Sequence, residues 1–144
     1  GKIFSCEKKA RNIINKILVN HNDFLNFISH KQNRNVSYFI WKKPWMVAAN
    51  NTFINHLLKI NKYQNVYGDL ERYPEIKIEK NVKVNIDVIF LSSEPYPFKK
   101  NHKKELQEIF PETKILLVDG EMFSWYGSRL LKAFDYFKKL RKSI

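Results

Sequence analysis

Two short, almost wholly apolar runs constrain the fold of this chain more than any other feature. They occupy 86–91 and 114–118, and each is followed by a turn and then by a helical pattern. A nearly unbroken apolar run of this length is typical of a strand that is covered on both faces. Two further strand patterns precede them at 36–41 and 45–49. Because strands and helices alternate, the sequence predicts an α/β fold, a three-layer lobe with a mostly parallel sheet flanked by helices.

Helical spacing of apolar residues is strongest at the beginning of the chain, where 6–30 reads as one long helix. This helix precedes the α/β pattern instead of alternating with it. Further helices are predicted after Thr52, which can cap a helix N-terminus, and at 75–81, 98–109 and 127–142. Pro74 and Pro97 are expected to begin two of them, because proline is favoured in the first helical turn.

The composition favours a folded and strongly basic domain. The chain has 144 residues, 44% of them hydrophobic, and a formal net charge of +12. Such a charge fits a nucleic acid, an anionic membrane surface or an acidic ligand, or it reflects lysines that merely face solvent. The single cysteine, Cys6, excludes an internal disulfide and a cysteine-based zinc site. No apolar run approaches the roughly 20 residues of a membrane-spanning helix.

Two loops that are rich in aromatic residues and glutamate follow the two apolar strands, at 92–98 and 119–129. The carboxyl ends of neighbouring parallel strands share one edge of a sheet, and ligands bind in the crevice there. We therefore expect both loops to line one site. Phe98 and Phe123 are expected to be core residues, whereas Tyr96 and Trp125 are candidates for flat contact surfaces.

The two loops offer little for catalysis. Glu94 and Glu121 can cap helices, dock to a basic partner or transfer protons, but neither loop contains a histidine. The four histidines lack the spacing of a metal site, and no phosphate-binding or nucleophile motif occurs. The sequence therefore favours a binding protein, not an enzyme, with no cofactor of its own. The alternative is a small basic nucleic-acid-binding domain, because lysines cluster at 99–104 and 138–142; the aromatic residues lie elsewhere, so no nucleic acid is expected.

From Trp41 onward the order of motifs resembles the C-terminal lobe of ABC-transporter substrate-binding proteins of the helical-backbone metal-receptor type. The segments that carry this resemblance are 41–54, 65–67, 72–75, 87–98 and 119–129. The first helix resembles the end of the long helix that joins the two lobes of such receptors. The resemblance therefore implies an interlobe helix at 1–32, a ligand-binding lobe at 33–144, and a missing N-terminal lobe. It covers nearly the whole chain but about half of a receptor.

The resemblance also implies function, ligands and partners. Receptors of this type are periplasmic or held at the cell surface, and they pass cobalamin, haem or a ferric siderophore to a membrane permease. The implied ligand-binding residues are Trp45, Asn50, Tyr67, Arg72, Tyr96 and Trp125. An exposed glutamate on each lobe docks to arginines of the permease, a role implied here for Glu94 and, second, for Glu121.

Overall fold

The computed structural model describes residues 1–78 and 85–144. The chain divides into two compact units, which are described separately below. The helical unit contains residues 1–31 and 125–144, and the α/β unit contains residues 32–124. The predicted division into 1–32 and 33–144 stays a prediction; the last 20 residues belong to the same unit as the opening helix.

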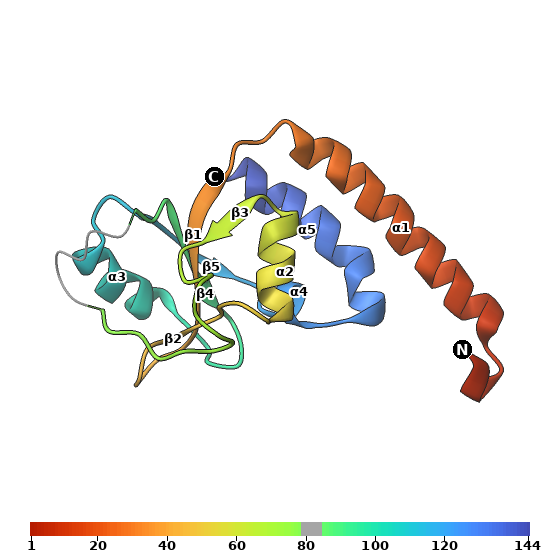
Figure 1. Ribbon diagram of the computed structural model, residues 1–144, viewed down its shortest axis with the longest axis horizontal. Helices are drawn as coiled ribbons and strands as arrows, with labels where there is room; N and C mark the ends of the chain where they lie inside the picture. Colours follow the sequence, from red (N-terminus) through yellow and green to blue (C-terminus); the bar gives the residue numbers. More distant parts are fainter. Residues whose placement is uncertain (79–84) are drawn as a thin grey trace. The chain divides into compact units, whose positions relative to one another are not determined.

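The helical unit is built on two long helices, α1 (Glu7–Ser29) and α5 (Leu130–Lys142), which lie side by side (Figure 1). Short 3-10 turns, η1 (Lys2–Phe4) and η2 (Gly127–Arg129), precede them. The buried ring of Phe24 joins the helices, with its centroid 5.7 Å from Phe134 and 6.0 Å from Phe137. The long first helix predicted for 6–30 is confirmed, and it runs from Glu7 to Ser29.

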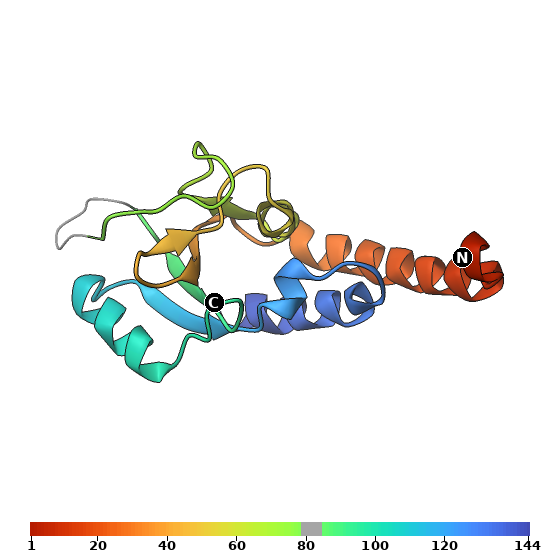
Figure 2. The ribbon, with the colours of Figure 1, turned by 90° about the horizontal axis from the view of Figure 1, so that it is seen from below.

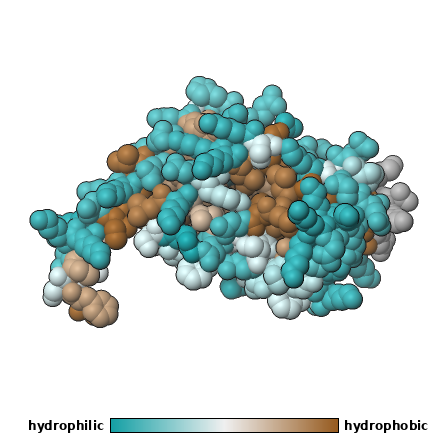
Figure 3. All heavy atoms as spheres, turned by 180° about the vertical axis from the view of Figure 1, so that it is seen from behind, coloured by the Kyte–Doolittle hydropathy of each residue, from teal (hydrophilic) through white to brown (hydrophobic). Residues whose placement is uncertain are grey.

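One side of α1 carries apolar side chains that remain exposed. Figure 3 shows them as brown spheres among hydrophilic neighbours along this helix. The exposed apolar residues of α1 are Ile14, Leu18, Val19 and Leu25. Within the residues that the structure describes, no helix is both long and apolar enough to cross a membrane.

A five-stranded sheet forms the α/β unit. Its strands are β1 (Arg34–Trp41), β2 (Met46–Val47), β3 (Tyr63–Asn65), β4 (Val88–Ser92) and β5 (Lys114–Val118). The order is β2-β1-β4-β5, and β3 pairs with the first half of β1. β1, β3, β4 and β5 are parallel, and only β2 is antiparallel. This arrangement confirms the predicted α/β fold with a mostly parallel sheet.

Helices cover both faces of the sheet, as Figures 1 and 2 show. On one face α3 (Lys100–Ile109) inserts Leu106, which packs with Phe98 and with Leu91 of β4 in an apolar cluster. On the other face lie α2 (Phe53–Ile60) and α4 (Glu121–Ser124). There the ring of Phe123 lies 5.1 Å from that of Tyr38. Phe98 and Phe123 are both buried, as the sequence predicted.

Two details of the helix predictions are wrong. Residues 75–78 are not helical, because their backbone follows β2: the Ile76 N–H donates to the Trp45 carbonyl at 2.9 Å, and Glu75 bridges Met46. The rest of that predicted helix, 79–81, lies outside the described residues. Pro97 does not begin α3, which starts at Lys100 because Phe98 first turns into the core.

Candidate ligand-binding site

The loops after β4 and β5 are joined by hydrogen bonds at the carboxyl edge of the sheet. The Ser93 N–H donates to the Val118 carbonyl at 2.9 Å, and the Gly120 N–H donates to Ser93 Oγ at 2.9 Å. Further along, Ser124 Oγ donates to Glu94 Oε1 at 2.8 Å. The expectation that these two strand-end loops share one edge is therefore confirmed for residues 92–94 and 118–124.

Gly120 permits this close approach. A Cβ atom at this position would lie 2.4 Å from Ser92 Oγ and 2.6 Å from Glu94 Cγ, well inside van der Waals contact. Ser92 is itself held in place, because its Oγ accepts from the buried Tyr38 hydroxyl at 3.1 Å and donates to the Glu94 carbonyl at 2.5 Å. The glycine thus seats one loop directly against the other.

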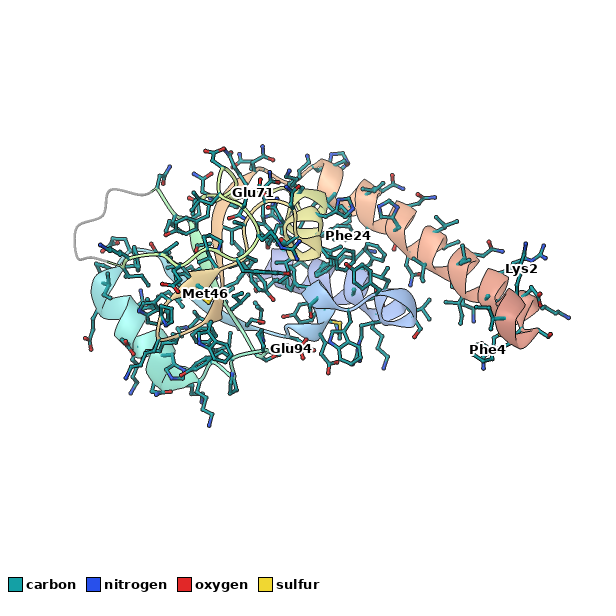
Figure 4. All side chains as sticks on the ribbon, turned by 60° about the horizontal axis from the view of Figure 1, so that its bottom comes forward. Lys2, Phe4, Phe24, Met46, Glu71 and Glu94 are labelled. Atoms are coloured by element: carbon teal, nitrogen blue, oxygen red, sulfur yellow. The ribbon has the colours of Figure 1, made fainter. Side chains whose placement is uncertain are left out.

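A recess of about 370 Å³ opens beside this junction, at the carboxyl ends of β1 and β4. Its lining is mostly apolar, with a few polar groups: Ile40, Trp41, Met46, Ile54, Tyr73, Ser92, Glu94, Pro95 and Ser124. Met46 and Glu94 are labelled in Figure 4. A concave apolar wall with few polar groups is the usual character of a small-molecule site.

Aromatic rings extend the recess on one side. Trp41 is 39% exposed, and its ring meets that of Tyr96 edge-on, with centroids 5.5 Å apart. The Tyr96 ring rests on Phe98 at 4.8 Å, so it is braced by the core below. Together, Trp41 and Tyr96 provide rigid apolar area next to the recess, and such rings lose little rotamer freedom when they bind a ligand.

His102 of α3 holds Tyr96 from behind. Its Nδ1 accepts from the Lys99 N–H at 3.0 Å, and its Nε2 lies 3.3 Å from the Tyr96 hydroxyl. Because Nδ1 is an acceptor, the neutral ring carries its proton on Nε2 and donates it to Tyr96. Burial lowers the pKa of His102, the nearby charge of Lys42 lowers it further, and Glu105 opposes this. The environment therefore favours the neutral imidazole that this arrangement needs.

Trp45 and Tyr67, two of the predicted ligand contacts, pack against the core cluster instead of lining the recess. The Trp45 ring stacks on Phe98, with centroids 6.1 Å apart and planes inclined by 4°. Tyr67 is half-buried, and burial raises the pKa of its hydroxyl.

Asn50 and Arg72 come together through their main chains. The Arg72 N–H donates to the Asn50 carbonyl at 2.8 Å, and the Arg72 carbonyl accepts from the Ala49 N–H at 2.7 Å. This ladder places Tyr73, the next residue, in the recess wall. Arg72 is exposed beside it.

Trp125 belongs to the helical unit and is 52% exposed. The Arg129 guanidinium lies over its ring, 5.5 Å from the centroid. These two residues line a shallow pocket of about 290 Å³ with Tyr126, Ser128 and Lys132. This pocket is aromatic and basic, and it shares no lining residue with the recess.

The two candidate docking carboxylates differ in setting. Glu94 is half-buried in the recess wall and accepts from Ser124. Glu121 occupies the first turn of α4, and its N–H donates to Asp119 Oδ1 at 3.1 Å. Glu94 follows β4 and Glu121 follows β5, so both carboxylates lie just after the carboxyl ends of neighbouring parallel strands.

Sequence reasoning missed Trp41, Met46 and Tyr73, which all line the recess. For Trp41 a signal was present, because it ends the predicted strand at 36–41 and therefore lies at a carboxyl strand end. Met46 and Tyr73 carried no such signal, since the bridge that brings 70–75 against 46–50 joins segments distant in sequence.

Among residues 1–78 and 85–144, no group of three or more histidine, cysteine, aspartate or glutamate side chains is close enough together to hold a metal ion. Glu94, the carboxylate in the recess wall, accepts a hydrogen bond from Ser124 Oγ. The arrangement suits the binding of an apolar, flat surface better than proton transfer.

Comparison with known proteins identifies the class of fold. No protein-family model matches the sequence, and no curated protein matches it. Solved structures of bacterial substrate-binding proteins do match. A possible iron-binding (periplasmic solute-binding) protein from Staphylococcus epidermidis is 21% identical, with a TM-score of 0.77 over 99% of this chain and 57% of that one.

Two further structures give similar agreement. An ABC-transporter substrate-binding protein from Listeria monocytogenes is 16% identical, with a TM-score of 0.78 over 97% of this chain and 59% of its own. The periplasmic haem-binding protein RhuT from Roseiflexus is 10% identical, with a TM-score of 0.79 over 99% of this chain and 57% of its own. The chain thus has the fold of part of a periplasmic substrate-binding protein, and it spans somewhat more than half the length of these proteins.

The substitution Gly120→Ala tests the junction between the loops. The added methyl group has to displace Ser92 or Glu94, so we expect the free energy of unfolding to fall by about 1–3 kcal/mol. Urea denaturation measures it. Gly127→Ala is the contrast, because its Cβ meets nothing within 4 Å and only its positive φ of 68° adds strain. If Gly120→Ala lowers the free energy of unfolding no more than Gly127→Ala does, the close packing of the two loops is contradicted.

His102 gives a prediction about pH. Its pKa is lowered in the folded state, so protonation favours the unfolded chain. We expect the stability of the wild type, relative to His102→Asn, to be constant above the ordinary histidine pKa of 6.5 and to decline as the pH falls below it. Asparagine retains an acceptor for the Lys99 N–H but does not titrate. Denaturation curves from about pH 8 to 5 measure the difference in free energy of unfolding between the two proteins. If this difference does not change with pH, the lowered pKa of His102 is contradicted.

Proposed function

We propose that this chain is the C-terminal lobe of an extracytoplasmic receptor that binds a metal chelate and delivers it to an ABC importer. One observation carries the proposal: an apolar recess with aromatic residues on its rim, placed where parallel strands of an α/β sheet end. The similarity in fold to solved periplasmic binding proteins supports it.

The chemistry of the recess is consistent with a ligand that brings its own metal. The chelator fills most coordination positions of the metal (all but the axial ones in haem), so the protein has to supply mainly contact area. Trp41, Tyr73 and Met46 offer this area, and Met46 adds a polarisable side chain that adapts to an irregular surface. Cobalamin, haem and ferric siderophores are the ligand classes that we propose.

A single lobe contacts one side of such a ligand. The loss of translational and rotational freedom on binding has to be offset by these contacts alone. We therefore propose that the affinity of this chain is much weaker than that of a receptor with both lobes. Arg72, exposed beside Tyr73, is the proposed contact for acidic groups on the ligand.

Ligand binding is tested by equilibrium dialysis of the purified chain against cyanocobalamin, haemin and a ferric hydroxamate, with tryptophan fluorescence as a second readout. We expect one of them to bind, and Trp41→Ala and Tyr73→Ala each to weaken it about tenfold, because each removes an aromatic wall. Leu25→Ala, an exposed apolar residue on α1, is the matched control. Retention of none of the three ligands would contradict the proposal.

Docking to the permease is proposed for Glu94, with Glu121 second. Both carboxylates lie on the strand-end loops of an otherwise basic chain, where they offer negative charge to arginines of a partner. In cells that depend on this importer, we expect Glu94→Ala and Glu121→Ala to reduce uptake several-fold. Ligand binding by Glu121→Ala should be unchanged, because Glu121 does not line the recess.

Glu112→Ala is the control for this experiment. Glu112 is exposed in the turn before β5, at the opposite edge of the sheet. Normal uptake by both the Glu94→Ala and the Glu121→Ala variant would refute the docking role. It would not contradict the proposal that the recess binds a ligand.

A further inference from the structure

Strand β5 is an edge strand of the sheet. Among the described residues it pairs only with β4. The Lys114 N–H donates to Asp87 and the Val118 carbonyl accepts from Ser93, so the backbone groups of residues 114, 116 and 118 point toward β4. In a parallel strand the alternate residues point the other way. The N–H and C=O groups of Ile115 and Leu117 therefore face outward, and no hydrogen bond joins them to another described residue.

A groove runs along this edge between β5 and α3. It has a volume of about 380 Å³, and its floor is formed by Leu116 and Leu117. The Leu117 side chain is 43% exposed, although it belongs to a strand. Gln107 is part of the lining and is fixed there, because its Nε2 amide group lies within hydrogen-bond distance of the Phe110, Pro111 and Thr113 carbonyl oxygens, at 2.9–3.1 Å. The groove is thus a built, apolar feature of the surface.

Lysines line the helix side of the groove. They are Lys100, Lys103 and Lys104, which α3 presents together. In the part of the chain that the structure describes, none of the three has a carboxylate within ion-pair distance. The carboxylate of Glu105, on the same helix, is paired with Lys42 of the β1–β2 turn instead. The groove therefore combines an apolar floor with an uncompensated positive rim.

We propose that this edge is a docking site for an extended, acidic segment of a partner protein. Such a segment adds a strand to the sheet by pairing with the outward backbone groups of Ile115 and Leu117. Its alternate side chains point to the α3 face, where an apolar one enters the groove over Leu117 and acidic ones reach the lysines. Charge, shape and open backbone groups all favour this occupant.

The proposed docking site is independent of ligand binding. None of the six residues that line the groove also lines the recess. A second copy of this chain is a poor occupant, because pairing of two β5 edges would bring two positive rims together.

The probe is a capped, fluorescently labelled peptide of about six residues in which valine and glutamate alternate. We expect anisotropy titrations with the full chain to show saturable binding that weakens as salt is raised. The triple variant Lys100→Glu, Lys103→Glu, Lys104→Glu should weaken binding at least about tenfold. The matched control, Lys9→Glu, Lys16→Glu, Lys139→Glu, changes the net charge equally at exposed positions elsewhere and should retain binding.

Backbone pairing is tested with the same peptide carrying N-methyl groups on alternate amides, which keeps its charge but removes donors. We expect the methylated peptide to lose binding. Leu117→Glu, which leaves α3 unchanged, serves as a second variant and should also repel the peptide. The proposal is overturned if the parent peptide does not bind, if both triple variants lose affinity equally, if methylation has no effect, or if sedimentation shows that the chain pairs with itself.

Discussion

Parallel pairing of β1, β4 and β5 is the constraint on which the rest of the α/β unit depends. The backbone ladder brings three strand ends to one edge, although these strands are separated by 46 residues between β1 and β4 and by 21 between β4 and β5. Ile40, Ser92 and the loop after Val118 meet there only because the strands run in the same direction. The helices on both faces bury the apolar sides of this ladder and keep its ends in register.

Much of the fold could be predicted from the sequence, because local patterns determine it. Apolar runs at 86–91 and 114–118 predicted β4 and β5, and helical spacing predicted α1 and α5. The segment at 75–78 was mispredicted for a physical reason. Its backbone groups pair with β2, which is distant in sequence, and such pairing overrides a local preference for helix after proline.

The site was harder to predict than the fold. Aromatic residues that look alike in sequence divide between two roles: the half-buried Trp45 stacks on Phe98, whereas Trp41 lies exposed at the rim of the recess. The difference comes from tertiary contacts, since the Trp45 ring also meets that of Phe39 edge-on, with centroids 5.5 Å apart. Only the position of Trp41 at a strand end could have been recognised in advance. His102 gave no sequence signal for its contact with Tyr96, because a lone histidine on a helix is common.

Gly120 restricts which amino-acid substitutions this part of the molecule can accept. Since even one carbon atom added there would overlap with the neighbouring loop, the position tolerates no side chain unless Ser92 and Glu94 shift together. A substitution at residue 92, 94 or 120 is therefore expected to require a compensating substitution at the other two positions. A glycine two residues after one parallel strand, paired with Ser-Ser-Glu at the end of the neighbouring strand, is a compact signature by which chains with the same junction can be recognised.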